Sequence, residues 1–445
     1  MDVNVLLVAV IAVGLFCTGI ISPRLIPKKD NYFVFWGVAI ILFYYFIVFP
    51  AVLILNNHGY VYSDWAPLLP NTLRDVVAYI GLSGVFFGSV ALTVALGLAT
   101  MAKEPHCYSE KRVEFRNRQE MERLWRRVGL SVFLIALLVL YLFAAAYGGV
   151  GGYLESARGI RTGRIEVDNP FSFLRPFMEL FLVVGVILFG CLLQRFSFLT
   201  FLVFVASSFV YMMIMWSSGA RLNLIIYPFV IFLALILHLR KTFLLAIATP
   251  AIAIALPFFV WAHSILFRTH DSGVIHLLAS YLSYPAASTM GHLEAGTFRG
   301  MIDFLMMPMY VLPTSLHSDG FTTAFNYNTS LIREGGGAEH GGTIPVDLLT
   351  LGVMQGDPIL GSMAVGVYWG GAILLISVLL RKIRHQPVRD SMAAAIILKV
   401  VLTGVIYADP SHFVRTNMPF IFLVLILVGL HFLRKCRSRK SELTP

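Results

Sequence analysis

Charged side chains are scarce in this sequence: Asp, Glu, Lys and Arg together make up 13% of its 445 residues, whereas soluble domains carry about 25%. Hydrophobic residues reach 58%. They form continuous runs such as FLIALLVLYLFAAA rather than the alternating segments of a membrane barrel. The shortage of charge therefore excludes an ordinary soluble domain and predicts an all-α polytopic integral membrane protein.

Cysteine is also rare, with four residues in the chain. Cys17 and Cys191 fall inside apolar runs, and Cys107 and Cys436 lie beside basic clusters. Their spacing matches neither a disulfide framework nor a structural zinc site. No nucleotide-phosphate motif occurs either, so a nucleotide-bound donor is not indicated. Disulfides and structural zinc are therefore not expected, and no cofactor is indicated.

Linkers and internal repeats are lacking as well. No long segment rich in proline or serine divides the chain, so residues 1–445 are interpreted as a single membrane-embedded domain. The absence of a visible repeat argues against a transporter built from inverted repeats. The first residues, MDVNVLLVAV, include no basic segment, and we interpret the first apolar run as a retained helix.

The apolar runs predict about eleven membrane spans, within a range of about 10 to 14. The predicted spans cover residues 3–22, 32–55, 77–101, 129–148, 176–194, 197–216, 222–238, 243–263, 359–380, 391–408 and 417–433. Lys399 stands in the middle of one span, and we leave open whether it is structural or faces a substrate.

The loops between these spans predict the topology. Lys and Arg are concentrated in alternate loops, above all in the segment 103–128, so that side is predicted to be cytoplasmic. We interpret 103–128 as a basic cytoplasmic loop facing water or lipid headgroups. The topology therefore explains the net charge of +10, which does not indicate nucleic-acid binding. The amino terminus is predicted outside and the carboxyl terminus inside.

On the predicted external side every cationic residue is an arginine. The ten are Arg74, Arg158, Arg161, Arg164, Arg175, Arg221, Arg268, Arg299, Arg333 and Arg415. Arginine offers a planar fork that binds phosphate and carboxylate in a bidentate manner. This side is therefore predicted to bind pyrophosphate or an acidic sugar, the alternative being that positive charge is merely depleted there.

Two short external segments carry the clearest anion-binding pattern. Arg158, Arg161 and Arg164 lie at spacings of three within 149–175, which is either an anion-binding loop or an ordinary solvated loop. The turn WSSGAR ends at Arg221, where a helix start would add free backbone N–H groups to the guanidinium. The alternative for Arg221 is an interfacial arginine that reaches toward the headgroups.

The long external segment 264–358 is predicted to form short interfacial or re-entrant helices over a cavity. Near its end, REGGGAEHGGTIP carries Arg333, Glu339 and His340 on a glycine-rich stretch suited to a gating hinge. Pro345 and Asp347 are predicted to restart ordered structure after it. The alternative is a disordered loop whose histidine has no role.

The last external loop, ADPSHFVR, places Asp409, His412 and Arg415 close together in sequence. These residues suit an acid/base pair with an anion clamp. They equally suit a capped helix entrance.

Three segments resemble the Wzy-type polymerases of O-antigen and enterobacterial common antigen, a family of lipid-linked oligosaccharide repeat-unit polymerases. They are SSGARLNLIIYPFVIFL, FRGMIDFLMMPMYVLPTSL and EHGGTIPVDLLTLGVMQGDPILG, and the similarity covers roughly residues 216–384. The resemblance implies a fold like that of GT-C glycosyltransferases in the bacterial inner membrane, metal-independent and with the active site facing the periplasm. It also implies an undecaprenyl-pyrophosphate-linked oligosaccharide as substrate and a Wzz-type chain-length co-polymerase as partner.

By position, the resemblance assigns Arg221 and the arginines of 158–164 to pyrophosphate and places His340 near the acceptor sugar. The residues suit this chemistry, because arginines stabilise the charge that departs with pyrophosphate. The candidate general bases are His340, Glu339 and Asp409. Two rivals remain: an O-antigen ligase that transfers to lipid A–core, and a transporter or flippase.

Overall fold

The structure is a computed structural model that describes part of the chain. The described residues are 32–57, 68–70, 72–101, 114–161, 169–218, 221–239, 274–307, 309, 323–334, 346–383, 385–411, 413–420 and 422–423. Regular secondary structure in these ranges is helical throughout. The predicted class, an all-α membrane protein, is confirmed at this level.

Six helices of the described part are long and apolar enough to cross a membrane. They are Phe33–Asn56, Leu73–Thr100, Gln119–Ala145, Ser172–Gln194, Phe198–Ser217 and Pro358–Arg381. Each overlaps a predicted span, although Gln119–Ala145 begins inside the predicted loop 103–128. The spans predicted at 3–22 and 243–263, with most of 417–433, lie outside the described residues. The total of eleven and the GT-C-like arrangement therefore stay predictions.

Two further predicted spans are helical, but one has a shorter apolar stretch and the other is divided into three elements. Residues 222–238 fall in α9 (Arg221–Leu239), whose clearly apolar part is the shorter stretch Ile226–Leu239. Residues 391–408 fall in three consecutive elements, α16 (Gln386–Ala395), the π-helix η6 (Ile396–Val401) and α17 (Leu402–Ile406). Arg389 and Asp390 in α16 and Lys399 in η6 interrupt the apolar character of these elements.

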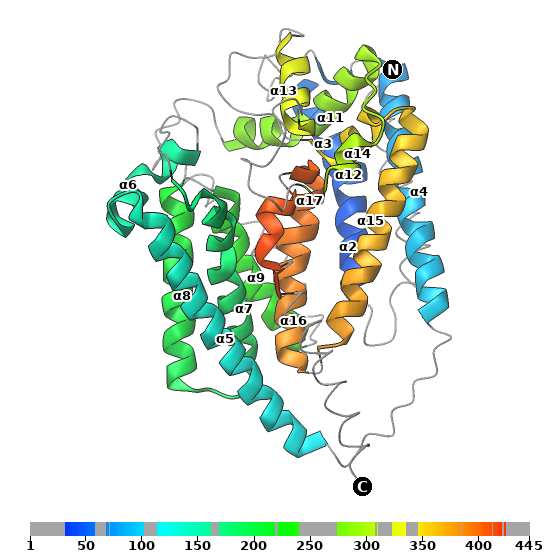
Figure 1. The fold of residues 1–445 in the computed structure, drawn as a ribbon. Helices are drawn as coiled ribbons and strands as arrows, with labels where there is room; N and C mark the ends of the chain where they lie inside the picture. The colour runs from blue at the N-terminus through cyan, green and yellow to red at the C-terminus, as the bar shows by residue number, and fades with distance from the viewer. Residues whose placement is uncertain are drawn as a thin grey trace.

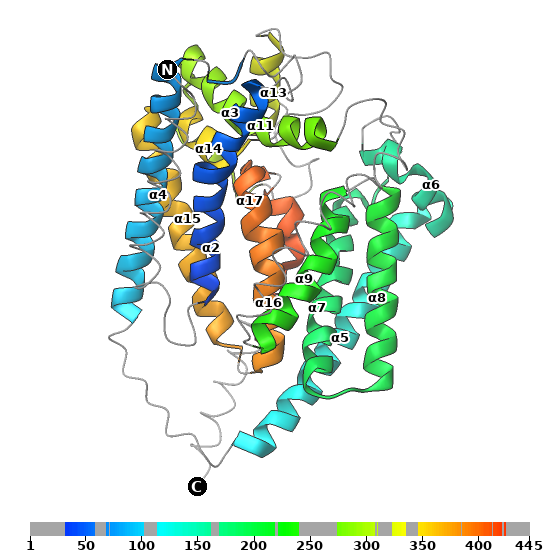
Figure 2. The ribbon, with the colours of Figure 1, turned by 180° about the vertical axis from the view of Figure 1, so that it is seen from behind.

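The long helices form two groups with the α16–η6–α17 segment between them (Figures 1 and 2). One group contains α2 (Tyr32–Phe43), η1 (Tyr44–Val48), α3 (Phe49–Asn57), α4 (Leu73–Met101) and α15 (Pro358–Arg381). The other contains α5 (Glu114–Ala145), η3 (Ser172–Glu179), α7 (Leu180–Gln194), α8 (Phe198–Ser217) and α9. α16 packs against α7 and α9, so the middle segment joins the groups.

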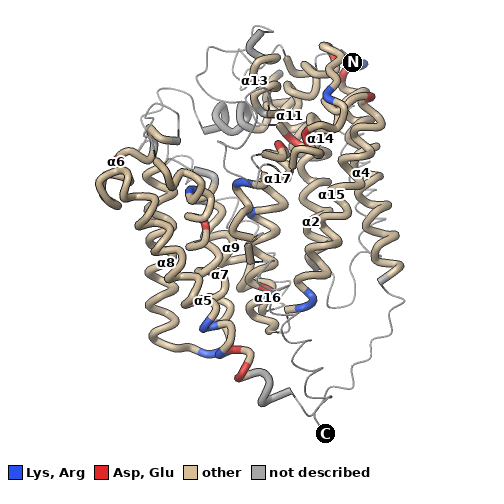
Figure 3. The backbone as a smooth tube through the Cα atoms, in the orientation of Figure 1, with Lys and Arg blue, Asp and Glu red and all other residues tan. Residues whose placement is uncertain are grey.

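Short helices cover one end of this bundle, which we call the capped end (Figures 1 and 2). They are α6 (Val150–Arg161), α11 (Val274–Ala295), α12 (Ile302–Leu305), α13 (Ala324–Glu334) and α14 (Leu348–Met354). At the capped end α4, α9 and α15 begin and α3, α8 and α17 end. Figure 3 shows most of the charged positions near the two ends of the bundle and few in its middle.

Glycine permits the closest contact at the capped end, between α14 and the start of α15. A Cβ added at Gly361 would lie 2.0 Å from the carbonyl oxygen of Gly352. No larger residue fits such a distance, so the glycines of LGVMQGDPILG serve the packing of these two helices. That packing fixes the turn between them, which carries Gln355.

Candidate functional site

Three aspartates are fully buried at the capped end. Asp303, Asp347 and Asp409 have relative exposures of 0%, 0% and 1%. A buried carboxylate is costly unless it is paired or hydrogen-bonded, and each of the three has partners. They come from separate parts of the chain, so the capped end gathers acidic groups that the sequence keeps apart.

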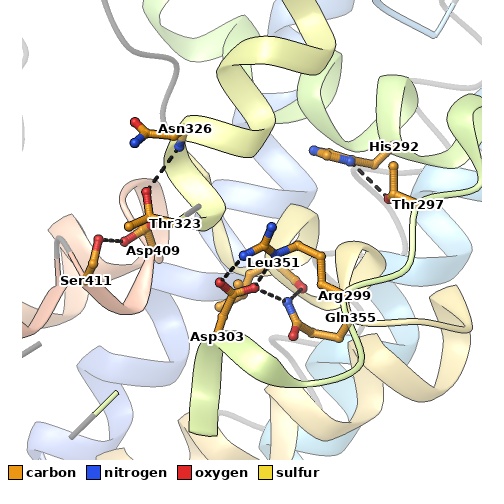
Figure 4. Close-up of polar contacts among 10 residues, drawn as sticks. All are labelled: His292, Thr297, Arg299, Asp303, Thr323, Asn326, Leu351, Gln355, Asp409 and Ser411. Carbon is orange, nitrogen blue, oxygen red and sulfur yellow. Dashed lines mark hydrogen bonds and ion pairs between the residues drawn. The ribbon is translucent and has the colours of Figure 1, made fainter. Parts of the chain in front are cut away.

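Asp303 is held by a bidentate ion pair with Arg299. Arg299 Nε donates to Asp303 Oδ2 at 2.7 Å and Nη2 donates to Oδ1 at 2.8 Å. Gln355 Nε2 adds a third hydrogen bond to Oδ2, at 3.1 Å, as Figure 4 shows. The guanidinium also lies over the ring of Tyr327, 4.9 Å from its centroid, a favourable cation–π geometry. The carboxylate is therefore satisfied and the arginine is fixed on two sides.

Backbone hydrogen bonds join the same two segments. The N–H of Arg299 donates to the carbonyl of Met354 at 2.8 Å, and that of Gly300 donates to the carbonyl of Gln355 at 3.0 Å. The next residue, Met301, has a φ of 63°, in the left-handed region that is unfavourable for a side chain of this kind. Strained positions of this type gather at functional sites.

Asp347 caps the amino end of α14. Its carboxylate accepts the backbone N–H of Thr350 at 3.1 Å and of Leu349 at 3.2 Å. It also accepts the Tyr45 hydroxyl at 2.7 Å and the Thr350 hydroxyl. Burial raises the pKa of Asp347 to about 6, against the opposing effect of these hydrogen bonds. The residue titrates close to neutral pH.

Asp409 lies beside this second acid. The backbone N–H of Ala408 donates to the carbonyl of Val346. Asp409 follows Ala408 and Asp347 follows Val346, so both aspartates lie next to this hydrogen bond. The Ser411 hydroxyl donates to Asp409 Oδ1, a contact visible in Figure 4. Of the three predicted bases, Asp409 is the one whose side chain the structure describes. Its carboxylate is buried and is oriented by the hydrogen bond from Ser411.

Sequence reasoning missed His292, which joins α11 to α13. Its Nδ1 lies 3.0 Å from Thr297 Oγ1, and its Nε2 lies 3.0 Å from Asn328 Oδ1. Burial, with a smaller contribution from the nearby Arg299, lowers the pKa of His292 to about 4, so the ring is neutral at physiological pH. Its ring stacks on that of Tyr327 with centroids 5.9 Å apart. The available signal was the run of polar residues in this otherwise apolar stretch.

The predicted anion-binding arginines lie on several elements. Arg158 and Arg161 belong to α6, Arg221 is the first residue of α9, and Arg333 is near the end of α13. Their side chains lie outside the described part of the structure. Arg415, which follows Asp409 by six residues, is partly buried. The backbone thus places these arginines on elements that meet or begin at the capped end.

Other predicted site residues, Arg164, Glu339 and His340, lie outside the described residues, as does His412. Within the part of the chain that the structure describes, no three side chains of His, Cys, Asp and Glu are grouped so as to hold a metal ion.

Comparisons of the chain with protein-family models, curated proteins and solved structures give no match. The likeness to the repeat-unit polymerases therefore depends on three sequence segments. Two of them, FRGMIDFL and LLTLGVMQGD, meet through Arg299, Asp303 and Gln355 in the structure.

Proposed function

We propose that the chain is a membrane glycosyltransferase that polymerises undecaprenyl-pyrophosphate-linked oligosaccharide repeat units. The growing glycan would move from its pyrophosphate carrier to a sugar hydroxyl of the next lipid-linked unit, in the synthesis of O-antigen, capsule or exopolysaccharide. The proposed setting is the bacterial inner membrane, with the capped end facing the periplasm and a Wzz-type co-polymerase as partner.

One observation carries this proposal. The two resembling segments lie about fifty residues apart, the Asp303–Gln355 separation being 52, yet they interlock through the buried Arg299–Asp303 pair and Gln355. They do so at the end of the bundle where α9 begins with Arg221, the key residue of the third segment. The proposal is supported by the fact that parts of all three resembling segments lie at the capped end.

In the proposed reaction the bond between the anomeric carbon and the pyrophosphate oxygen breaks while a bond to the acceptor hydroxyl oxygen forms. The hydroxyl proton passes to a base, for which Asp409, Glu339 and His340 are the candidates. The electron pair leaves with undecaprenyl pyrophosphate, whose charge Arg158, Arg161, Arg164, Arg221, Arg333 and Arg415 would stabilise. Pyrophosphate is a good leaving group, so the site needs charge stabilisation more than a strong acid.

The Lys399–Glu179 pair bears on the alternative that the chain is a transporter or flippase. A transporter or flippase would be expected to carry polar groups along a path through its spans. Lys399 and Glu179 are the residues that interrupt the predicted spans most clearly, and their side chains pair with each other. This pairing favours chemistry at the capped end over passage through the bundle.

The purified full-length protein incubated with one lipid-linked repeat unit tests the proposal. A ladder of longer lipid-linked glycans is expected. Product that forms only when lipid A–core is added would instead identify a ligase. Movement of the labelled lipid across proteoliposomes without elongation would identify a transporter.

A further inference from the structure

A second group of buried and partly buried polar side chains lies at the opposite end of the bundle. Trp125 and Arg126 belong to α5, His238 lies at the end of α9, and His385 caps the start of α16. The group lies away from the capped end and has no part in the proposed transfer reaction.

Close helix contacts place α5 and the start of α16 on the same stretch of α7. Gly129 of α5 faces Leu188 of α7, since a Cβ added there would lie 2.5 Å from Leu188 Cδ2. Gly190 of α7 faces the backbone of Val388 in α16, where an added Cβ would lie 2.7 Å from the Val388 Cα. Both contacts fall within one turn of α7, so the two neighbouring helices meet at one level.

From these contacts the position of the polar group follows. Arg126 precedes Gly129 by three residues, and His385 precedes Val388 by three residues, so each lies about one turn further toward the end of the bundle. At that level Arg126 Nη2 donates to the carbonyl of Arg195, which follows α7, at 2.9 Å. The two side chains therefore gather around the end of α7.

Several donors in this group are buried without a hydrogen-bond partner among the described residues. His385 is 4% exposed. Its Nδ1 accepts the backbone N–H of Val388 at 3.4 Å, so the ring proton resides on Nε2, which has no partner. Trp125 Nε1 and Arg126 Nε are likewise buried and unpaired. Buried N–H groups are rarely left unsatisfied. Arg126 lies close enough to His385 to affect its pKa, so these two unpaired donors indicate a missing acceptor, and Trp125 adds a third unpaired donor on the residue next to Arg126.

The charge around His385 favours an acceptor that is an anion. Burial lowers the pKa of His385 to about 4, with smaller contributions from the nearby Arg126 and His238. His385 also stands at the amino end of α16, where the helix dipole adds partial positive charge. An anion would therefore relieve a concentration of positive potential.

The acids of this region already have partners. Glu122 pairs with Arg126, one turn along the same helix. Asp390 Oδ2 lies 3.9 Å from His238 Nδ1, and Asp390 Oδ1 lies 3.8 Å from Arg389 Nε. Gln386 also donates to Asp390, at 3.4 Å. The unpaired donors of Trp125, Arg126 and His385 are thus left for a group from outside the described chain.

We propose that Trp125, Arg126, His238 and His385 form a binding site for a phosphate-type oxyanion, which we call the basic-end site. The phosphoryl group of an anionic lipid and free phosphate share this chemistry, and α5 and α7 bring the site to the end of two membrane-crossing helices. The proposal is independent of the transferase activity.

Native mass spectrometry of the full-length protein in neutral detergent tests it, with phosphatidylglycerol and phosphatidylcholine as probes. We expect the wild type to retain phosphatidylglycerol preferentially. His385→Phe and Arg126→Met should each weaken that retention by about tenfold or more, because each removes a charge-assisted or buried donor. Arg123→Met is the matched control, an exposed arginine on the same helix, and should change retention by less than about twofold.

Two further arms make the result decisive. His385→Gln keeps an N–H donor near Nε2 and should retain the lipid, which separates donor loss from misfolding. Inorganic phosphate, compared with chloride at equal ionic strength, should raise the unfolding temperature if the source is free phosphate. A wild type that shows neither lipid preference nor a phosphate effect would mean that only water satisfies these donors, and the proposal would be wrong. Equal losses in Arg123→Met and Arg126→Met would overturn it too.

Discussion

Lys399 Nζ lies 2.8 Å from Glu179 Oε1, and this ion pair joins residues 220 positions apart within the bundle. Asn223 Oδ1 accepts a second hydrogen bond from the same ammonium at 2.7 Å. Three elements, η6, the end of η3 and the first turn of α9, thus meet at one buried cation. The same contact fixes the beginning of the helix that Arg221 opens.

Removing Lys399 should therefore be costly. Lys399→Met leaves Glu179 buried without its charge partner, and we expect a loss of about 3–5 kcal/mol in unfolding free energy. Denaturant unfolding in detergent measures it. The double variant Lys399→Met/Glu179→Leu should recover most of the loss, because both charges are then gone. Lys382→Met, an exposed lysine, is the control, and losses that simply add in the double variant would contradict the pairing.

The bidentate geometry of Arg299 predicts that lysine cannot replace it. Arg299→Lys keeps the charge but loses one of two parallel hydrogen bonds to Asp303 and the stacking on Tyr327, so we expect about 1–3 kcal/mol of destabilisation. Arg299→Met should cost about 3–5 kcal/mol, since Asp303 is then buried alone. Thermal unfolding of both variants beside Arg74→Met, an exposed arginine at the capped end, provides the comparison. A fully stable Arg299→Met would refute a buried pair.

Asp347 should make stability depend on pH near neutrality. Its pKa of about 6 in the folded chain lies above the ordinary value of 3.8, so the folded state binds the proton more tightly. The stabilisation from this group is present below about pH 4 and is lost as pH rises through about 6. Asp347→Asn should remove this loss. The difference in unfolding temperature between wild type and variant, measured from pH 4 to pH 8, should shift in favour of the variant, and a difference that does not vary with pH would refute the assignment.

For the proposed reaction, Arg221→Ala and Arg161→Ala should abolish the glycan ladder, with losses of about a hundredfold or more per charge-stabilising group. Arg221→Lys should also fail, because the fork is lost. Purified variants given one lipid-linked repeat unit provide the measurement, with Arg74→Ala as the control. Wild-type ladders from both alanine variants would remove the pyrophosphate assignment.

The identity of the general base is tested separately. We expect His340→Ala to lower turnover by about a hundredfold, with the lipid-linked donor still bound. Should turnover stay unchanged, the base would lie at Asp409 or Glu339, and Asp409→Asn and Glu339→Gln distinguish these two in the same assay.

The sequence predicted the helices that depend on local composition. Long apolar runs require spans wherever they occur, so the prediction of 77–101 agrees with α4 to within a few residues. It also identified Lys399 as an exception in an apolar segment. The pairing of Lys399 with Glu179 was beyond reach, because nothing in either local sequence specifies a partner 220 residues away.

The candidate site shows the same limit. Asp409 was identified from a local motif, whereas the Arg299–Asp303–Gln355 group arises from packing between α12 and the turn after α14. Arg299 and Asp303 are four residues apart, so the sequence could have indicated their pairing. The contribution of Gln355 depends on the close contact of Gly352 with Gly361, a tertiary fact that composition does not reveal.

The wide turn at Ile396–Val401 has a consequence for how this chain tolerates insertions and deletions. Leu402 donates its N–H to the carbonyl of Ile397, five residues back, so this turn holds one residue more than an α-helical turn would. Deleting one residue within this turn would restore a regular α-helical turn and leave the residues on either side facing their present neighbours. The same deletion in the α-helical stretch α16 would rotate everything beyond it by about 100° around the axis and turn Asp409 toward a different neighbour. A one-residue deletion is therefore expected to disturb the final loop more when it falls in α16 than when it falls in the wide turn.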